Sequence, residues 1–378
     1  MERAREESPP GFHPLAGCDL RNFLAHRKLT GELSARTKRQ RISSFLAVLA
    51  RQPFTLVERA VYGRRVEQHD LPHPPIFIIG HWRSGTTHLH NLMSRDENFS
   101  YIDFGQTAMP HNLLNPTRFI GRAAISAVMP KDRGMDRVEL GIEEPQEEEM
   151  ALGNLNPLCY YNVFYYPHEM KHHFDRAIFF DDTTEQERKD FRDAYRKLLR
   201  KLSLSSGGKQ LLLKNPASTA RIPVLDEVFP GARFIHIVRN PYEVFASMLH
   251  HYPRLFNAFS WHDFDDIDLE EMVFYKYARL MKGYLEQREQ IKDRLVETSY
   301  ERVVADPAGE IGSFYESFDL PGRDAALERV REYVEARKGY RRNQYQLTRA
   351  QVDRIESDWG FALAEWGYSI PDSIEIAD

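Results

Sequence analysis

The pattern of hydrophobic positions predicts a parallel sheet built from the middle of the chain. Residues 76–79 are all apolar, are mostly β-branched and end at Gly80, which is typical of a strand buried on both faces. Two further apolar runs, 211–213 and 234–238, each end at a basic residue that is followed by Asn-Pro. Because the helical segment 218–229 lies between them, we expect a right-handed strand–helix–strand crossover.

Most of the remaining chain has a helical pattern. Helices are expected within residues 15–70, 87–95, 269–294 and 311–336, and 294–297 is a candidate last strand. These elements predict an α/β fold of P-loop-like type, with three layers and a central parallel sheet flanked by helices. The expected division is an N-terminal helical extension at 1–70, with a disordered start, and one α/β domain at 71–378.

The helical segment 42–62 carries an apolar face with arginines among it. The apolar members are Phe45, Leu46, Leu49, Leu56, Val57, Ala60 and Val61, and the arginines are Arg51, Arg59, Arg64 and Arg65. This spacing favours a helix whose apolar face is packed on the core. The alternative is a basic amphipathic helix that makes peripheral contact with a membrane or a lipid substrate through residues 42–62.

Composition excludes several classes of protein. The chain has 378 residues, of which 42% are hydrophobic, which is ample for a buried core. Its net charge of -5 gives no general reason to expect nucleic-acid binding. The two cysteines, Cys18 and Cys159, suggest no disulfide framework, and no apolar stretch reaches the roughly 18 residues of a membrane span. With a charged, polar N-terminus, the chain is expected to be cytoplasmic.

The loop after the first strand has the features of a phosphate site. Gly80 and Gly85 allow a tight turn, and the following helix presents its N–H groups and its positive dipole end. Ser84, Thr86 and Thr87 add hydroxyl groups, and Arg83 adds a fixed cation. The alternative is a glycine-containing turn without a ligand.

The spacing of the two glycines matches a P-loop, but one defining residue differs. A P-loop has lysine directly after the second glycine, where it contacts the β- and γ-phosphates of a nucleoside triphosphate. Here Thr86 takes that place. The loop therefore favours a ligand with a single 5′-phosphate, with Arg83 as the cation.

A second anion site is expected at the end of strand 234–238. Arg239 follows that strand, and Asn240, Pro241 and Glu243 form the start of a helix as N-cap, first residue and first-turn acid. Ser247 lies on the same helix. A guanidinium group and a hydroxyl group in this arrangement suit a second phosphate. Arg239 alone is more typical of a structural ion pair, and its pairing with the first loop favours the phosphate site.

These motifs together resemble those of sulfotransferases that use 3′-phosphoadenosine 5′-phosphosulfate (PAPS). RSGTT at 83–87 is similar to the 5′-phosphosulfate loop of that family, and VRNPYEVFAS at 238–247 is similar to its 3′-phosphate motif. The longer string FIIGHWRSGTTHLHNLM resembles a bacterial-type branch that has arginine in the loop. The resemblance covers roughly residues 75–345, so 71–378 would be a sulfotransferase domain.

The resemblance implies a role for each matching residue. The 5′-phosphosulfate would be held by Arg83, Ser84, Gly85, Thr86 and Thr87, the 3′-phosphate by Arg239 and Ser247, and the adenine by Tyr300 and His88. Arg337-Lys338-Gly339 is similar to a basic motif near the C-terminus of the cytosolic enzymes. One of Lys338, Arg341 and Arg342 would then contact the 3′-phosphate, and Arg341 is included in the predicted site.

The general base departs from the pattern of the family. Arg83 and Lys214 are expected to stabilise charge on the leaving phosphate, with no metal. The histidine of the family's KTH segment is absent, because Asn215-Pro216 follow Lys214, and Ser218 stands where many bacterial relatives have a histidine. The acidic run 143–149 is the main substitute.

Within that run, Glu147 and Glu149 are the favoured bases. Mutual repulsion among neighbouring carboxylates raises their pKa values and can bring a base toward neutrality. The alternative is an ordinary helix start, with Pro145 as its first residue and acids in its first turn. His81 and His111 are weaker candidates.

The predicted function is transfer of the sulfuryl group of PAPS to a hydroxyl of a small-molecule or lipid-like acceptor. One alternative is a P-loop nucleotide kinase or NTPase, for which Asp181-Asp182 would have to supply the Walker B acid. The other is a catalytically silent nucleotide-binding protein, which the missing histidine would favour.

Overall fold

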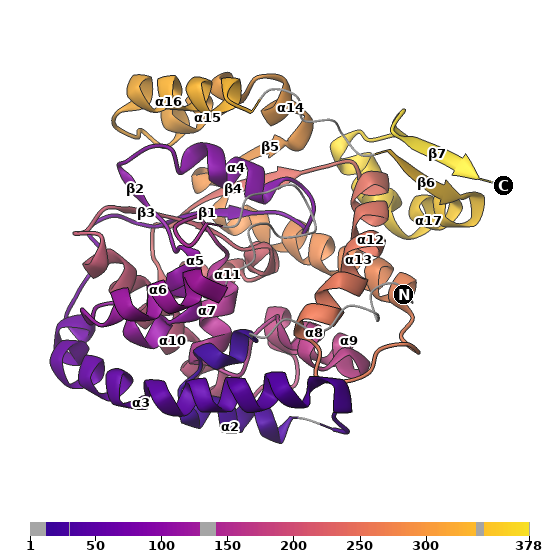
Figure 1. The fold of residues 1–378 in the computed structure, drawn as a ribbon. Helices are drawn as coiled ribbons and strands as arrows, with labels where there is room; N and C mark the ends of the chain where they lie inside the picture. Colours follow the sequence, from indigo (N-terminus) through magenta and orange to yellow (C-terminus); the bar gives the residue numbers. More distant parts are fainter. Residues whose placement is uncertain (1–12, 30, 129–140, 338–343, 378) are drawn as a thin grey trace. The chain divides into compact units, whose positions relative to one another are not determined.

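A computed structural model describes residues 13–29, 31–128, 141–337 and 344–377 of the chain (Figure 1). Its internal contacts divide the chain into two compact units. Unit 1 comprises residues 1–73, 100–211 and 252–267, and unit 2 comprises 74–99, 212–251 and 268–378. The first break, at His73–Pro74, lies close to the predicted division at residue 71, which stays a prediction.

The central sheet has the strand order β2-β3-β1-β4-β5. Its strands are β1 (Ile76–Ile79), β2 (Phe99–Ser100), β3 (Gln210–Lys214), β4 (Arg233–Val238) and β5 (Leu295–Ser299). The pairs β1–β3, β1–β4 and β4–β5 are parallel, with Ile78 opposite Lys214 and Ile79 opposite His236. The predicted strands and the parallel crossover are therefore confirmed.

The helices of unit 2 form a layer on each face of this sheet (Figure 1). Ile76 and Ile78 of β1 belong to a buried cluster that also includes residues of α4 (Thr86–Met93), α15 (Pro307–Ser317) and α16 (Arg323–Glu335). Phe77 points to the other face, because side chains alternate along a strand, and its ring centroid lies 5.9 Å from that of Phe229.

The second layer contains α11 (Ile222–Val228) and α13 (Leu269–Gln287). His236 of β4 stacks on Tyr284 of α13 with 3.7 Å between the ring centroids. The predicted three-layer α/β fold is confirmed by this arrangement.

The remaining elements of unit 2 refine the prediction. The expected helix 311–336 is interrupted at Gly322, which has a φ of +80° and caps α16. The expected helix 269–294 ends at Gln287 and continues as a 3-10 helix, Arg288–Arg294. A second, two-stranded parallel sheet near the C-terminus was not predicted, and it consists of β6 (Tyr345–Thr348) and β7 (Ile374–Ala377), joined through α17 (Arg349–Trp366). Each of these strands has four residues, and unlike β1 each mixes polar with apolar residues, so neither forms a recognisable apolar run.

Unit 1 is predominantly helical. Its helices include α2 (Leu20–Lys28), α3 (Lys38–Glu67), α5 (Phe104–Ala108), α6 (Arg118–Val128), α7 (Glu148–Leu155), α8 (Asn162–Tyr165), α9 (Met170–Phe179) and α10 (Glu185–Ser205). Helix α12 (Pro241–Phe259) begins in unit 2 and ends in unit 1, and α14 (Tyr300–Ala305) follows β5 in unit 2. In the part of the chain that is described, no helix is long and apolar enough to cross a membrane.

Helix α3 packs on unit 1 through the face opposite to the one that was predicted. Its buried positions are mostly polar, among them Gln40, Ser44 and Glu58. The apolar residues that were expected to pack on the core are exposed instead, including Leu46 at 57% and Val61 at 64%. The expectation that this face is covered by the core is therefore wrong, because buried polar partners, and not apolar area, fix the rotation of the helix.

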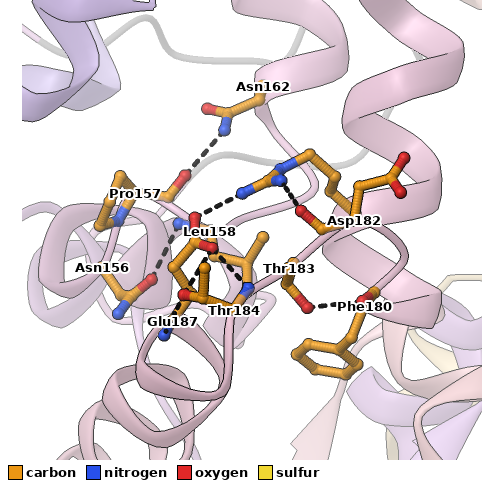
Figure 2. Close-up of polar contacts among 10 residues, drawn as sticks. Asn156, Pro157, Leu158, Asn162, Phe180, Asp182, Thr183, Thr184 and Glu187 are labelled. Carbon is orange, nitrogen blue, oxygen red and sulfur yellow. Dashed lines mark hydrogen bonds and ion pairs between the residues drawn. The ribbon is translucent and has the colours of Figure 1, made fainter.

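The segment between α9 and α10 shows that Asp181-Asp182 is not a Walker B pair (Figure 2). A Walker B acid follows a buried strand, whereas this pair follows helix α9. Asp182 has a φ of +50°, and its carbonyl accepts a hydrogen bond from Arg176, which also pairs with Glu187. Thr184 and Glu187 form a capping box at the start of α10. The aspartates therefore belong to a helix-connecting turn.

Candidate active site

The loop after β1 begins at a glycine that no other residue could replace without strain. Gly80 has a φ of +146°, and a Cβ atom there would lie 2.2 Å from the carbonyl oxygen of Ile237 and 3.0 Å from Ser84 Oγ. The Thr219 hydroxyl accepts from the Gly80 N–H at 2.8 Å and donates to the Gly80 carbonyl at 3.1 Å. The loop is thus fixed to the sheet at its first residue.

Arg83 occupies a left-handed backbone conformation, with a φ of +70°. This conformation costs a non-glycine residue about 1–2 kcal/mol. The Arg83 side chain donates from Nε to Ser247 Oγ at 2.8 Å. The structure therefore places an arginine where glycine would be less strained, and it connects the guanidinium group to α12.

The second loop glycine makes room for an aromatic ring. Gly85 has a φ of +95°, and a Cβ atom there would lie 2.5 Å from Cδ2 of Tyr300. Tyr300 is buried, and the Arg239 guanidinium carbon lies 4.3 Å from its ring centroid. Tyr300 thus packs between the loop and Arg239, in a position that orients both.

Arg239 joins the two predicted anion sites. Its Nε donates to Glu243 at 2.9 Å, and its NH1 donates to the Arg83 carbonyl at 3.4 Å. Burial lowers the pKa of Arg239, but the Glu243 carboxylate outweighs burial and raises that pKa above its ordinary value. Asn240 Oδ1 accepts from the Tyr242 N–H at 3.1 Å, which confirms the predicted start of α12. Arg83, Ser247, Arg239 and Tyr300 are therefore brought together.

A lysine and a helix N-terminus complete this cluster. Helix α4 begins at Thr86, so the N–H groups of its first turn lie at the loop, where the helix dipole favours an anion. Lys214, at the end of β3, is buried, and its Nζ donates to Thr87 Oγ1 at 3.3 Å. Lys214 and Thr87 are thus placed next to each other, which brings a second cation to the loop.

Ser84 provides the sharpest sign that the loop holds a ligand. Its hydroxyl is buried and has no hydrogen-bond partner within the described part of the chain. A buried hydroxyl without a partner costs about 1–3 kcal/mol, and a ligand oxygen bound in the loop would remove that cost. Gly80 keeps open the space beside Ser84 Oγ that a side chain would otherwise fill.

Two histidines lie near the loop. His88 meets the edge of Tyr300, with 6.3 Å between ring centroids, and burial lowers its pKa. His81 is buried with a ring centroid 4.9 Å from Tyr277, and burial lowers its pKa to about 3. Such a low pKa makes His81 a weak base. In unit 1, burial lowers the pKa of His111 to about 4.

The acidic run 143–149 belongs to unit 1, and its members have separate partners. Glu143 pairs with Arg122 at 3.6 Å, and Glu148 accepts from the Tyr195 hydroxyl at 2.6 Å. Glu149 is fully buried and accepts from the Tyr160 N–H at 2.6 Å. Because Glu148 and Glu149 lie in the first turn of α7, the helix-start interpretation is confirmed for them, although the helix starts three residues after Pro145.

Glu147 directly precedes α7. It is the half-buried N-cap residue of α7, and its side chain forms no capping hydrogen bond. The C-terminal candidates Lys338, Arg341 and Arg342 lie outside the described residues.

Lys276 is a candidate residue of the active site that the sequence motifs did not identify. It lies on α13 with 1% exposure, and its Nζ lies 5.3 Å from the ring centroid of Trp82 in the loop. Burial lowers its pKa well below the ordinary value. Its spacing in the sequence could have revealed it, because Lys276 falls on the same buried face of α13 as Val273 and Leu280.

Comparison with known proteins identifies the family. A family model described as "Sulfotransferase family" matches residues 74–325, about two thirds of the chain. The chain belongs to the sulfotransferase family. The matched region contains Arg83, Lys214, Arg239, Ser247 and Tyr300, which form the cluster described above.

This sulfotransferase is also similar to individual proteins. It is 30% identical to "Omega-hydroxy-beta-dihydromenaquinone-9 sulfotransferase Stf3" of Mycobacterium bovis over 83% of this chain and 80% of that protein. The crystal structure of sulfotransferase STF9 from Mycobacterium avium matches with a TM-score of 0.70 at 17% identity, covering 91% of this chain and 88% of that one. STF1 from Mycobacterium tuberculosis matches with a TM-score of 0.62 at 17% identity, covering 90% of each chain. The two crystal structures confirm the fold.

Family membership decides among the three functions that the sequence left open. The protein is a sulfotransferase enzyme, so the kinase and the silent nucleotide-binding protein are set aside. Among the described residues, no group of three or more His, Cys, Asp or Glu side chains is arranged to hold a metal ion.

Proposed function

We propose that this sulfotransferase transfers the sulfuryl group of PAPS to a hydroxyl of a lipid-like acceptor in the cytoplasm, without a metal and without a nucleic-acid partner. The observation that carries the proposal is the arginine cluster at the strand ends. Arg83 and Arg239 are linked through the Arg83 carbonyl, next to a buried hydroxyl of Ser84 that has no partner in the described residues. Two fixed cations suit a nucleotide with phosphate groups on both its 5′ and 3′ oxygens.

The residues present fit this co-substrate. The α4 N-terminus, Ser84, Thr86, Thr87 and Arg83 would hold the 5′-phosphosulfate. Arg239 and Ser247 would hold the 3′-phosphate, with Glu243 fixing the plane of the Arg239 guanidinium group. Tyr300 would act mainly by positioning the loop and Arg239, because it packs against both, with His88 at the adenine side. Arg341 stays a prediction from the sequence.

The chemistry of the site follows from its charges. Bound there, PAPS would supply an activated sulfuryl group, with adenosine 3′,5′-bisphosphate as the leaving group. Arg83 and Lys214 would stabilise negative charge on the 5′-phosphate oxygens as the sulfur–oxygen bond breaks. Both are held by hydrogen bonds, Arg83 by Ser247 and Lys214 by Thr87, and cations fixed in this way would limit the reorganisation that charge stabilisation requires.

The proposed acceptor class rests on the Stf3 relative. The name of that relative describes a hydroxylated dihydromenaquinone as the compound it sulfates, and the similarity spans most of both chains. The test compares the rate of sulfuryl transfer from radiolabelled PAPS to hydroxylated isoprenoid quinones with the rate of transfer to short alcohols and phenols. We expect the quinones to be the better acceptors. A second test is equilibrium binding of adenosine 3′,5′-bisphosphate against ATP. Failure of transfer to every hydroxyl acceptor, or a preference for ATP, would contradict the proposal.

Replacement of Arg239 should remove the preference for the 3′-phosphate. We expect Arg239→Gln to weaken binding of adenosine 3′,5′-bisphosphate by about 10–100-fold, because a charge-assisted contact is lost. Binding of adenosine 5′-phosphosulfate, which lacks the 3′-phosphate, should change much less. Isothermal titration calorimetry with both nucleotides measures the ratio, and an equal loss for both would assign Arg239 a purely structural role.

Glu147 is the proposed general base. We expect Glu147→Gln to lower kcat by about 10²-fold, at the lower end of what a general base contributes, with donor affinity unchanged. Glu149→Gln is the matched control. Glu149 is buried and accepts a hydrogen bond from the Tyr160 N–H, so its substitution should lower the melting temperature more than kcat. Steady-state kinetics and thermal unfolding of both variants give the comparison. A Glu147→Gln enzyme with wild-type kcat, beside a Glu149→Gln enzyme with strongly lowered kcat, would contradict the assignment.

A further inference from the structure

Helix α3 exposes its apolar side and buries its polar side. The exposed large apolar residues of α3 are Ile42, Phe45, Leu46, Leu49, Phe54, Leu56, Val57 and Val61, with exposures between 38% and 64%. A surface helix of a globular protein normally has the reverse arrangement. A continuous exposed row of this kind indicates an interaction surface.

Specific polar contacts hold α3 in this orientation. Gln40 Oε1 accepts from the Trp261 indole at 3.1 Å, and Arg51 donates to the Ala16 carbonyl at 2.6 Å. Glu58 pairs with Lys201 inside unit 1. Turning the helix to bury its leucines would leave these groups without partners, which is costly in a low-dielectric interior. The exposure of the apolar row is therefore a stable property of unit 1.

The charges beside the apolar row are mostly basic. Helix α3 has two acidic residues, the buried Glu58 and the exposed Glu67 at its last position, whereas five of its basic residues are exposed: Lys38, Arg39, Arg59, Arg64 and Arg65. Helix α2 lies beside α3 (Figure 1) and adds exposed Leu24 and Leu29 together with exposed Arg21, Arg27 and Lys28. The two helices thus form one apolar and basic surface, here called the α2–α3 face.

A basic hollow adjoins the C-terminal end of this face. Its volume is about 670 Å³. It is lined by Val61, Arg64 and Arg65 of α3, by His69 just after that helix, and by Gly207 and Gly208 on the other side. It therefore continues from the apolar row at Val61 directly into a cationic pocket. Such a pocket suits a phosphate group carried on an apolar chain.

We propose that the α2–α3 face binds the surface of a bilayer that contains anionic lipids. The apolar side chains of α3 would enter the boundary between headgroups and acyl chains, with the helix axis in the membrane plane, and the arginines would contact lipid phosphates. A second copy of this chain fits the face less well. In a two-fold dimer the same face meets itself, so the exposed arginines would repel one another.

Vesicle binding of the full-length protein tests the proposal without using its activity. We expect the wild type to float with phosphatidylcholine vesicles that contain 30% phosphatidylglycerol, and at least tenfold less protein to float with phosphatidylcholine alone. The double substitution Leu46→Glu with Leu56→Glu should lower binding to the anionic vesicles at least tenfold. Both side chains are more than half exposed, so the variant should keep the wild-type melting temperature.

Two further variants separate the contributions of charge and apolar surface. Arg59→Glu with Arg65→Glu should also lower binding to the anionic vesicles at least tenfold, and added salt should weaken binding of the wild type. Val304→Glu, at an exposed valine of α14 in unit 2, is the matched control and should bind like the wild type. The proposal is overturned if the wild type does not float, or if the Leu46/Leu56 variant floats equally well. It is also overturned if sedimentation shows a wild-type dimer that these substitutions dissociate.

The proposal does not depend on the acceptor. The vesicle assay contains neither PAPS nor a quinone, so an error in the proposed substrate would leave its outcome unchanged. Conversely, binding of adenosine 3′,5′-bisphosphate in solution reports on the arginine cluster of unit 2 and should be the same in the Leu46/Leu56 variant.

Discussion

Replacing Arg83 by glycine should lower kcat/KM for sulfuryl transfer by about 10²–10³-fold while changing the free energy of unfolding by no more than about 1 kcal/mol. The loss of activity follows from removing a fixed cation that stabilises charge on the leaving phosphate. The small change in stability follows from the backbone, because the φ of +70° at Arg83 strains arginine and suits glycine. Relief of this strain offsets the lost hydrogen bond to Ser247 and the greater entropy of glycine in the unfolded chain.

Two variants control for this result. Arg83→Ala keeps the strain and loses the cation, so it should be as inactive as the glycine variant and less stable. Arg302→Ala removes an arginine of α14 whose side chain is 62% exposed, and it should leave kcat/KM near the wild-type value. Steady-state kinetics and chemical denaturation of the three variants give the comparison. An Arg83→Gly enzyme with wild-type kcat/KM would show that the cation has no part in transfer.

The sheet and the anion loops were predictable because their signals are local. A strand buried on both faces is mostly apolar, so β1 appears as an uninterrupted apolar run in the sequence and β4 as a run broken only by His236 after its first residue. Ligand-binding loops of parallel sheets follow the carboxyl ends of strands, which located Arg83 and Arg239 without knowledge of the fold. The bond between Arg83 and Ser247 spans 164 positions, yet both ends lay in recognised motifs.

Other features depended on contacts that a linear pattern does not contain. The periodicity of α3 identified two faces but could not show which one is buried. The choice is made by partners far along the chain, such as Trp261 for Gln40 and Lys201 for Glu58. In the same way, the acidic run gave no sign that Glu149 is held by the Tyr160 N–H.

The Glu58–Lys201 pair should be the most sensitive polar contact of unit 1. Both side chains are almost fully buried, with exposures of 2% and 6%, and the Lys201 Nζ also donates to the Pro110 carbonyl at 2.8 Å. Lys201→Met leaves the Glu58 carboxylate buried without its counter-charge. We therefore expect this variant to lower the free energy of unfolding by about 3–5 kcal/mol, measured by urea denaturation.

A second substitution should restore much of that loss. The Glu58 carboxylate also accepts from the N–H groups of Leu114 and Asn115 at 2.9 and 3.0 Å. Glu58→Gln removes the charge but keeps an oxygen that can accept these hydrogen bonds. Combined with Lys201→Met, it leaves no unpaired buried charge, and the double variant should be more stable than Lys201→Met alone. Additive losses in this cycle would show that the two side chains do not interact, and that α3 is held in its unusual orientation by its other polar contacts.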